Sequence, residues 1–350
     1  MELNKRDNTI DIAKGITIFL MVLGHNIFNS IISEKIYIFH MPLFFFLSGF
    51  FIKKEPFVEF VQNKIKRLIL PFIFYWLFIR IWNCIFIFIT NGLSADAIKD
   101  YINSERFFPN SGSLWFLISL FSVCVVSYFL IFKIRTLYVI VILILFNIIA
   151  YTLPNVQGVF PLYYGQSMLV LPFFVFGYWF YNVNKNNSLY KYLISLSSTY
   201  IIFLIFLTFL LLLFIPWENL DISVQMWSNP ISLYGGAFCG ILLILLLSSY
   251  ISKKIRLLSN LFSLWGKESL HILGYHEPIM FLLWYFAIPI YIRVAPYIGF
   301  EIFQGYEIRQ NVYWLVYIVS ILTTIICSHI GKYTENKYPH FLGINKGYKI

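Results

Sequence analysis

The sequence predicts an all-α membrane protein, a polytopic transmembrane bundle of about ten spans with both termini in the cytoplasm. Of its 350 residues, 59% are hydrophobic and only 12% are charged, and the mean hydropathy is +0.76. Soluble globular domains do not have this composition. Long apolar runs recur from one end of the chain to the other, and Lys and Arg concentrate in alternate connecting segments. Both patterns are typical of polytopic helical membrane proteins.

Ten apolar stretches have about the length that a membrane-spanning helix needs. They are 10–30, 36–52, 68–90, 113–132, 137–153, 165–183, 193–215, 231–250, 262–292 and 311–329. With the N-terminus inside, the cytoplasmic segments hold 18 Lys and Arg residues and the outer segments hold five. This asymmetry follows the positive-inside rule. No internal repeat or low-complexity linker divides the chain, so we expect residues 1–350 to form a single domain.

The net charge of +10 does not indicate a nucleic-acid partner, because the basic residues are scattered among short loops. They are better explained as topology signals and contacts with lipid headgroups. The four cysteines lie within apolar runs without a CxxC pair, and no ligand spacing suggests a metal. The first apolar run lacks a cleavage site and is expected to be retained. We therefore expect a multi-pass protein of the cell membrane, a bacterial inner or plasma membrane, with the lipid bilayer as a partner.

The first stretch carries three ionisable side chains, Asp11, Lys14 and His25. A charge at mid-bilayer costs about 2.5–3.5 kcal/mol on insertion scales, so such groups turn toward protein or water. Lys14 and His25 are eleven residues apart, which places them on one helix face about 16 Å apart along the axis. Asp11 lies one turn before Lys14 on the same side. We interpret His25 as functional, whereas Lys14 has the alternative of extending to the cytoplasmic interface.

Four further features are candidates for the site. His40 and Pro42 suggest an opened first turn at the start of the second stretch, tolerated only where it lines protein or a cavity. Lys66 and Arg67, before Pro71, suit an anionic ligand such as a nucleotide phosphate, and equally suit lipid phosphates.

The other two candidates lie in later stretches. Trp115, at the outer start of the fourth stretch, is either an interfacial belt residue or a cavity wall. His276, within the ninth stretch, is expected to face the bundle interior.

Several of these motifs together resemble the acyltransferase family 3 membrane proteins, and most closely the fucose 4-O-acetylase-like branch. The resemblance rests on Ile10-Asp11 through Lys14-Gly15 to Gly24-His25, then on Phe39-His40-Met41-Pro42 through Ser48-Gly49-Phe50. It continues through Lys66-Arg67-Leu68-Ile69-Leu70-Pro71, Leu114-Trp115-Phe116-Leu117, Gly266-Lys267-Glu268-Ser269-Leu270 and His276, so that it covers most of the chain.

The resemblance implies an integral membrane O-acyltransferase with about ten core helices. Such a protein moves an acyl group, usually acetyl from cytoplasmic acetyl-CoA, to a hydroxyl of a surface glycan or a lipid-linked sugar. His25 matches the essential histidine of the family's first helix, and Lys14 stands where many members have arginine. Lysine keeps the charge but not the planar fork, so a bidentate contact does not carry over.

The residues and the resemblance together predict a mechanism. CoA phosphates would rest near Lys14, Lys66 and Arg67, and His25 would act as general base on the acceptor hydroxyl. An acetyl-histidine intermediate stays open. Asp11 is expected to pair with Lys14.

His40, Trp115 and His276 are expected to line the same substrate cavity. A transporter or flippase of lipid-linked sugars is the alternative function. It predicts inverted repeats, which the sequence does not display.

Overall fold

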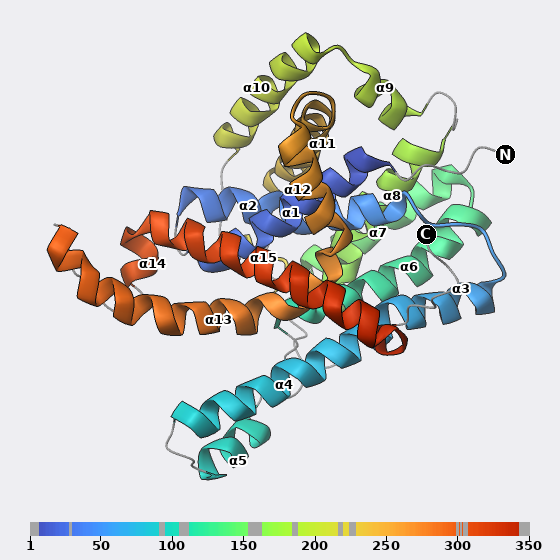
Figure 1. Cartoon of the computed structure of the whole chain (residues 1–350). Helices are drawn as coiled ribbons and strands as arrows, with labels where there is room; N and C mark the ends of the chain where they lie inside the picture. The colour runs from blue at the N-terminus through green and yellow to red at the C-terminus, as the bar shows by residue number, and fades with distance from the viewer. Residues whose placement is uncertain are drawn as a thin grey trace. The chain divides into compact units, whose positions relative to one another are not determined.

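The computed structural model describes residues 7–27, 30–90, 95–104, 112–152, 163–183, 188–215, 220–223, 229–298, 301, 303 and 307–342. Within these residues the regular elements are helices and there is no β-strand (Figure 1). This confirms the predicted all-α class. The α-helices are α1 (Asn8–Asn26), α2 (Ile31–Gly49), α3 (Phe57–Lys64), α4 (Leu70–Thr90), α5 (Ala95–Asn103), α6 (Trp115–Lys133), α7 (Thr136–Thr152), α8 (Tyr164–Asn182), α9 (Leu189–Ser195), α10 (Ser198–Phe214), α11 (Gly236–Lys254), α12 (Arg256–Lys267), α13 (Ser269–Val294), α14 (Glu307–Asn311) and α15 (Tyr313–Lys337).

The chain divides into two compact units. The first comprises Met1–Phe44, Tyr192–Asp221 and Met226–Tyr333, and the second comprises Phe45–Lys191, Ile222–Gln225 and Thr334–Ile350. Helix α2 begins in the first unit and ends in the second. That residues 1–350 act as a single domain stays a prediction.

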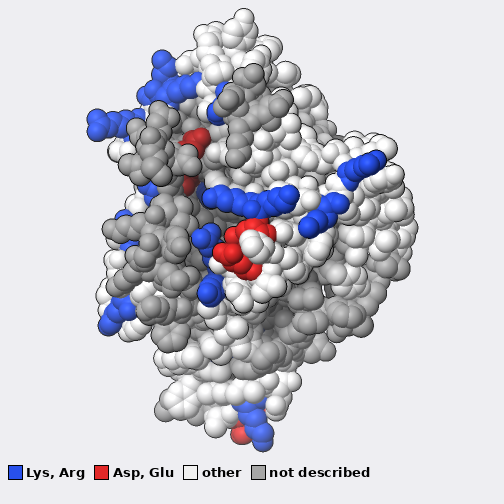
Figure 2. All heavy atoms as spheres, turned by 90° about the vertical axis from the view of Figure 1, so that its right-hand side faces the viewer, with Lys and Arg blue, Asp and Glu red and all other residues white. Residues whose placement is uncertain are grey.

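Each of the ten predicted stretches coincides with a described helix or helix pair, and the protein is a multi-pass membrane protein. Among the described residues, six helical segments are long and apolar enough to cross a membrane. A seventh is added if α9 and α10, bent by 111°, form one broken span. Wide areas of the face in Figure 2 carry neither Lys or Arg nor Asp or Glu, as a lipid-facing surface requires. The count of ten and the cytoplasmic termini stay predictions.

Two expected boundaries are wrong. Helix α2 begins at Ile31, so Pro42 lies in its interior rather than in an opened first turn. The expected stretch starts at residue 36, after the charged residues Glu34 and Lys35, whereas the helix includes both of them. The predicted stretch 262–292 joins the end of α12 to α13, and the two helices are separated at Glu268.

A π-helical turn, Ile65–Ile69, connects α3 to α4. It ends two residues before Pro71, which has no N–H to donate to the carbonyl four residues earlier, so the regular α-helical ladder is interrupted here. Such widened turns occur frequently at functional sites.

Helices α1 and α12 of the first unit approach each other backbone to backbone. A Cβ on Gly15 would lie 1.8 Å from the carbonyl oxygen of Phe262, and one on Gly266 would lie 1.8 Å from the carbonyl oxygen of Asp11. Only glycine permits this distance, because no side-chain carbon fits between the two backbones. The contact holds the N-terminal half of α1 against α12. The predicted orientation places this half on the cytoplasmic side.

In the second unit, the end of α2 packs equally closely on α8. A Cβ on Gly49 would lie 2.1 Å from the carbonyl oxygen of Phe174, and one on Gly177 would lie 2.0 Å from that of Phe46. Small residues at helix crossings are the usual solution in membranes, where van der Waals packing drives association.

Candidate active site

The last turn of α1 presents His25 next to a firmly held asparagine. Asn26 is fully buried, and its amide nitrogen donates to the carbonyl of Val316 at 3.0 Å and to Oγ of Ser320 at 2.8 Å. Its amide oxygen accepts the indole N–H of Trp284 at 2.6 Å. These bonds tie the end of α1 to α13 and α15 and therefore restrict where His25 can point.

His25 is half-buried and lies beside two side chains of α2. Its Nδ1 is 3.4 Å from the Tyr37 hydroxyl, and the two ring centroids are 6.0 Å apart. Tyr37 in turn packs edge-on against His40, with centroids 5.2 Å apart. His40 is buried, and its Nδ1 lies 2.9 Å from the carbonyl oxygen of Ile36. A base held by a second group is the arrangement that proton transfer requires.

His276 of α13 completes the group on the other side of His25. The two imidazole centroids are 5.3 Å apart. His276 is fully buried, as the sequence predicted, and its Nδ1 is 2.9 Å from the carbonyl oxygen of Leu273. We call His25, Tyr37, His40 and His276 the histidine cluster. Its members come from three helices of one compact unit.

Two carboxylates lie near the cluster. Glu277 is close enough to act electrostatically on His25, His276 and Tyr37. Asp221 acts in the same way on Tyr37 and His40. The cluster therefore has carboxylates as well as imidazoles within electrostatic range.

The other end of α1 holds Asp11 and Lys14. Asp11 is buried where α1 meets Gly266, and Lys14 is half-buried. The structure therefore places a cationic side chain and His25 on one continuous helix, as predicted. The pairing of Asp11 with Lys14 stays a prediction.

The remaining sequence candidates belong to the second unit. Lys66 and Arg67 are exposed on the π-helical turn before Pro71. Trp115 is buried. The centroid of its ring lies 6.4 Å from the ring centroid of Phe45 and 6.1 Å from that of Tyr163. An enclosed indole favours the wall interpretation of Trp115 over an interfacial belt. Whether these residues share a cavity with the histidine cluster stays a prediction.

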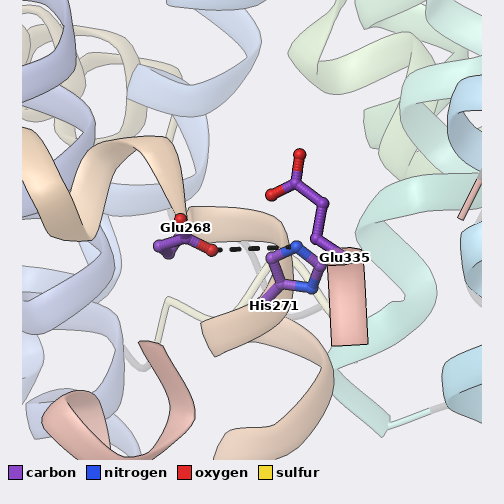
Figure 3. Close-up of side chains that lie close together, drawn as sticks. All are labelled: Glu268, His271 and Glu335. Atoms are coloured by element: carbon purple, nitrogen blue, oxygen red, sulfur yellow. Dashed lines mark ion pairs between the residues drawn. The ribbon is translucent and has the colours of Figure 1, made fainter. Parts of the chain in front are cut away.

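A second buried polar group lies at the start of α13. Figure 3 shows the ion pair of Glu268 Oε2 with His271 Nε2, 3.8 Å apart, and both side chains are buried. Glu335, also drawn there, belongs to the second unit. His271 packs against Gly331 of α15, where a Cβ would lie 2.4 Å from the histidine Cβ.

Sequence reasoning missed Tyr37, Asn26 and Asp221. Tyr37 lies among apolar and aromatic residues, and the protein has 25 tyrosines, so nothing in the sequence singled it out. Asn26 was identifiable as the polar residue that follows His25 within an apolar stretch.

The fold and the site define a class: a multi-pass helical membrane protein with a histidine cluster held inside its helices. The profile of acyltransferase family 3, described as an acyltransferase domain, matches residues 7–331. The chain therefore belongs to this family, and the acyltransferase domain accounts for most of its length.

Two curated relatives share part of the sequence. The nodulation protein NolL of Sinorhizobium fredii is 32% identical over 129 residues, which is 33% of this chain and 34% of the relative. The nodulation protein NolL of Mesorhizobium japonicum is 31% identical over 129 residues, 33% of each chain. The matched region thus covers about a third of either relative's length. No solved structure matches the chain.

Proposed function

We propose that this enzyme transfers an acetyl group, or a similarly small acyl group, from cytoplasmic acetyl-CoA to a hydroxyl of a surface or lipid-linked glycan. His25 acts as the general base. The membership in acyltransferase family 3 supports acyl transfer. The proposal for His25 is carried by its place in the histidine cluster, beside Tyr37 and His276.

A neutral imidazole is suited to this role because it titrates close to working pH. If Nδ1 of His25 donates to the Tyr37 oxygen, 3.4 Å away, Nε2 keeps its lone pair for the acceptor's proton. Tyr37 then orients the ring, in the way that a third group orients the base in other acyl transfer sites. The half-buried state of His25 leaves it accessible to a substrate.

The reaction is a balanced exchange. The acceptor hydroxyl oxygen attacks the thioester carbonyl carbon while its proton moves to His25. The carbon–sulfur bond then breaks, and CoA leaves as the thiol after taking that proton from the imidazolium. The products are the O-acetylated acceptor and free CoA.

The donor enters from the cytoplasmic end of α1 in this proposal. Lys14 lies about 16 Å from His25 by helix rise, a separation that suits a long, thin thioester donor. Lys14, Lys66 and Arg67 would contact the CoA phosphates as cationic donors, Arg67 through its planar fork. His40, Trp115 and His276 would line the substrate cavity. The enzyme would act in a bacterial cell membrane.

The experiment is label transfer in lipid vesicles. Purified protein would receive radiolabelled acetyl-CoA together with lipid-linked and surface glycans extracted from the producing cells. We expect the wild type to label the glycan fraction and His25→Ala to label it about 10²–10⁴-fold more slowly. His329→Ala serves as the control, because this histidine is exposed on α15 away from the cluster. Equal labelling by wild type and His25→Ala would contradict the assignment of His25.

A further inference from the structure

His276 has an acceptor nitrogen that nothing satisfies in the part of the chain that the structure describes. Its Nδ1 is 2.9 Å from the carbonyl oxygen of Leu273, so this nitrogen carries the hydrogen and donates. Nε2 is consequently left with a lone pair. Among the described residues this buried atom has no hydrogen-bond partner. A buried polar atom without a hydrogen bond destabilises the folded protein, so its presence here suggests a function.

The nearest cluster member that can supply a proton is His25. The imidazole centroids are 5.3 Å apart and the ring planes differ by 46°. At this separation, two ring nitrogens that face each other are about 3 Å apart, which is the length of a hydrogen bond. Because His276 is fully buried, solvent water does not reach its Nε2. A hydrogen-bond donor for this atom has to come from a neighbouring group.

The charge state of His25 decides whether this bond is useful. Neutral His25 needs its own Nε2 lone pair for the acceptor's proton. In the resting state it therefore has no second N–H to donate to His276. Once His25 has taken the proton, both of its ring nitrogens are donors. One keeps its bond to Tyr37, and the other, once the acceptor oxygen has released its proton, can bond His276. An interaction made only with the imidazolium stabilises the charged intermediate, and the transition states that lead to and from it, rather than the bound substrate.

We propose that His276 is a positioning residue whose Nε2 accepts a hydrogen bond from His25 as His25 becomes protonated. The other charged and titratable groups around the pair are Tyr37 and His40 on α2, Glu277 on α13 and Asp221. The inference rests on the proposed function of His25 as general base. It adds a second histidine that acts through the first.

The test compares two substitutions that treat the ring nitrogens differently. His276→Asn keeps an amide N–H in place of Nδ1 and deletes the acceptor at Nε2. His276→Gln extends further and can place its amide oxygen where Nε2 lies. Initial rates of glycan labelling from radiolabelled acetyl-CoA give kcat and the donor KM for each variant. His329→Asn is the matched control, since its Nδ1 also lies 2.8 Å from a carbonyl, that of Ile325, on an exposed surface.

We expect His276→Asn to lower kcat about 10- to 100-fold, because a hydrogen bond to a charged group contributes that much to the rate. The donor KM stays unchanged, His276→Gln recovers part of kcat, and His329→Asn behaves as the wild type. In a His25→Ala background, His276→Asn has no further effect on the residual rate, because residues that act as a unit are not additive. Thermal unfolding of each variant in the same lipid checks that it is folded.

Three outcomes would overturn the role of His276. One is an unchanged kcat in His276→Asn, and another is a selective change in KM. The third is an equal further loss from His276→Asn in the His25→Ala background. In each case the proposed function still stands if the wild type labels the glycan and His25→Ala loses most of that labelling. Absence of labelling by the wild type rejects the proposed function itself.

Discussion

At the scale of single residues, the site is built around the pair of His25 and Asn26. Asn26 forms three hydrogen bonds to α13 and α15, and its neighbour projects toward Tyr37 and His276. A buried amide that makes several hydrogen bonds is held rigidly. A chain surrounded by lipid thus gains a fixed imidazole without an exposed charge.

Tyr37 gives the first prediction. Tyr37→Phe removes the hydroxyl 3.4 Å from His25 Nδ1 and leaves the ring that packs on His40. A neutral hydrogen bond contributes about 0.5–1.5 kcal/mol, so kcat for acyl transfer should fall up to about tenfold. Initial rates at saturating acetyl-CoA measure this. A wild-type kcat in Tyr37→Phe would show that Tyr37 does not orient His25.

Lys14 gives a second prediction, about the donor. Lys14→Ala should weaken acetyl-CoA binding, and Lys14→Arg should retain it, because the charge is what both cationic residues supply. Thermal stabilisation of the protein by CoA reports donor affinity, since a ligand that binds only the folded state raises its stability. If both variants bind CoA like the wild type, Lys14 only extends to the membrane interface.

At the scale of elements, the packing of α1 on α12 holds the N-terminal half of α1, which carries Lys14. Gly15 and Gly266 allow the backbones to touch Phe262 and Asp11. The contact of these glycines could not be predicted from the sequence, because it joins segments about 250 positions apart. Sequence reasoning predicted the helices themselves, since about 20 apolar residues are sufficient evidence for a span.

Gly266→Ala tests this contact. The added Cβ would lie 1.8 Å from the Asp11 carbonyl oxygen, so the helices must separate, which typically costs about 1–3 kcal/mol. The midpoint of thermal unfolding in lipid or detergent should fall. Gly235→Ala is the control, because among the described residues no atom outside the glycine's own helix backbone and chain neighbours lies within 4 Å of a Cβ at that position. Equal unfolding midpoints for Gly266→Ala and Gly235→Ala would contradict the close packing of α1 on α12.

At the scale of the whole molecule, composition and charge asymmetry were sufficient to predict a helical membrane protein, and motif spacing was sufficient to indicate its family. The break between α12 and α13 was not predicted, because Glu268 lies between two apolar stretches that read as one. Nor was the role of Tyr37, since only the fold brings α2 beside the end of α1. His25 and His276 were both predicted; their contact was not.

The orientation of the chain gives a prediction at the same scale. With 18 Lys and Arg residues in one set of connecting segments and five in the other, the C-terminus should be cytoplasmic. A C-terminal fusion to a green fluorescent protein should fluoresce, and one to alkaline phosphatase should be inactive. An active phosphatase with a dark fluorescent protein would reverse the topology and place Lys14 at the outer face.

The central claim is that His25 moves the acceptor's proton during acyl transfer. Its most direct test is the steady-state rate of glycan labelling by His25→Ala in lipid vesicles, with acetyl-CoA varied. General base catalysis contributes about 10²–10⁴-fold, so kcat should fall by that factor while the donor KM stays at the wild-type value. A wild-type kcat accompanied by a raised donor KM would contradict the claim and make His25 a binding residue.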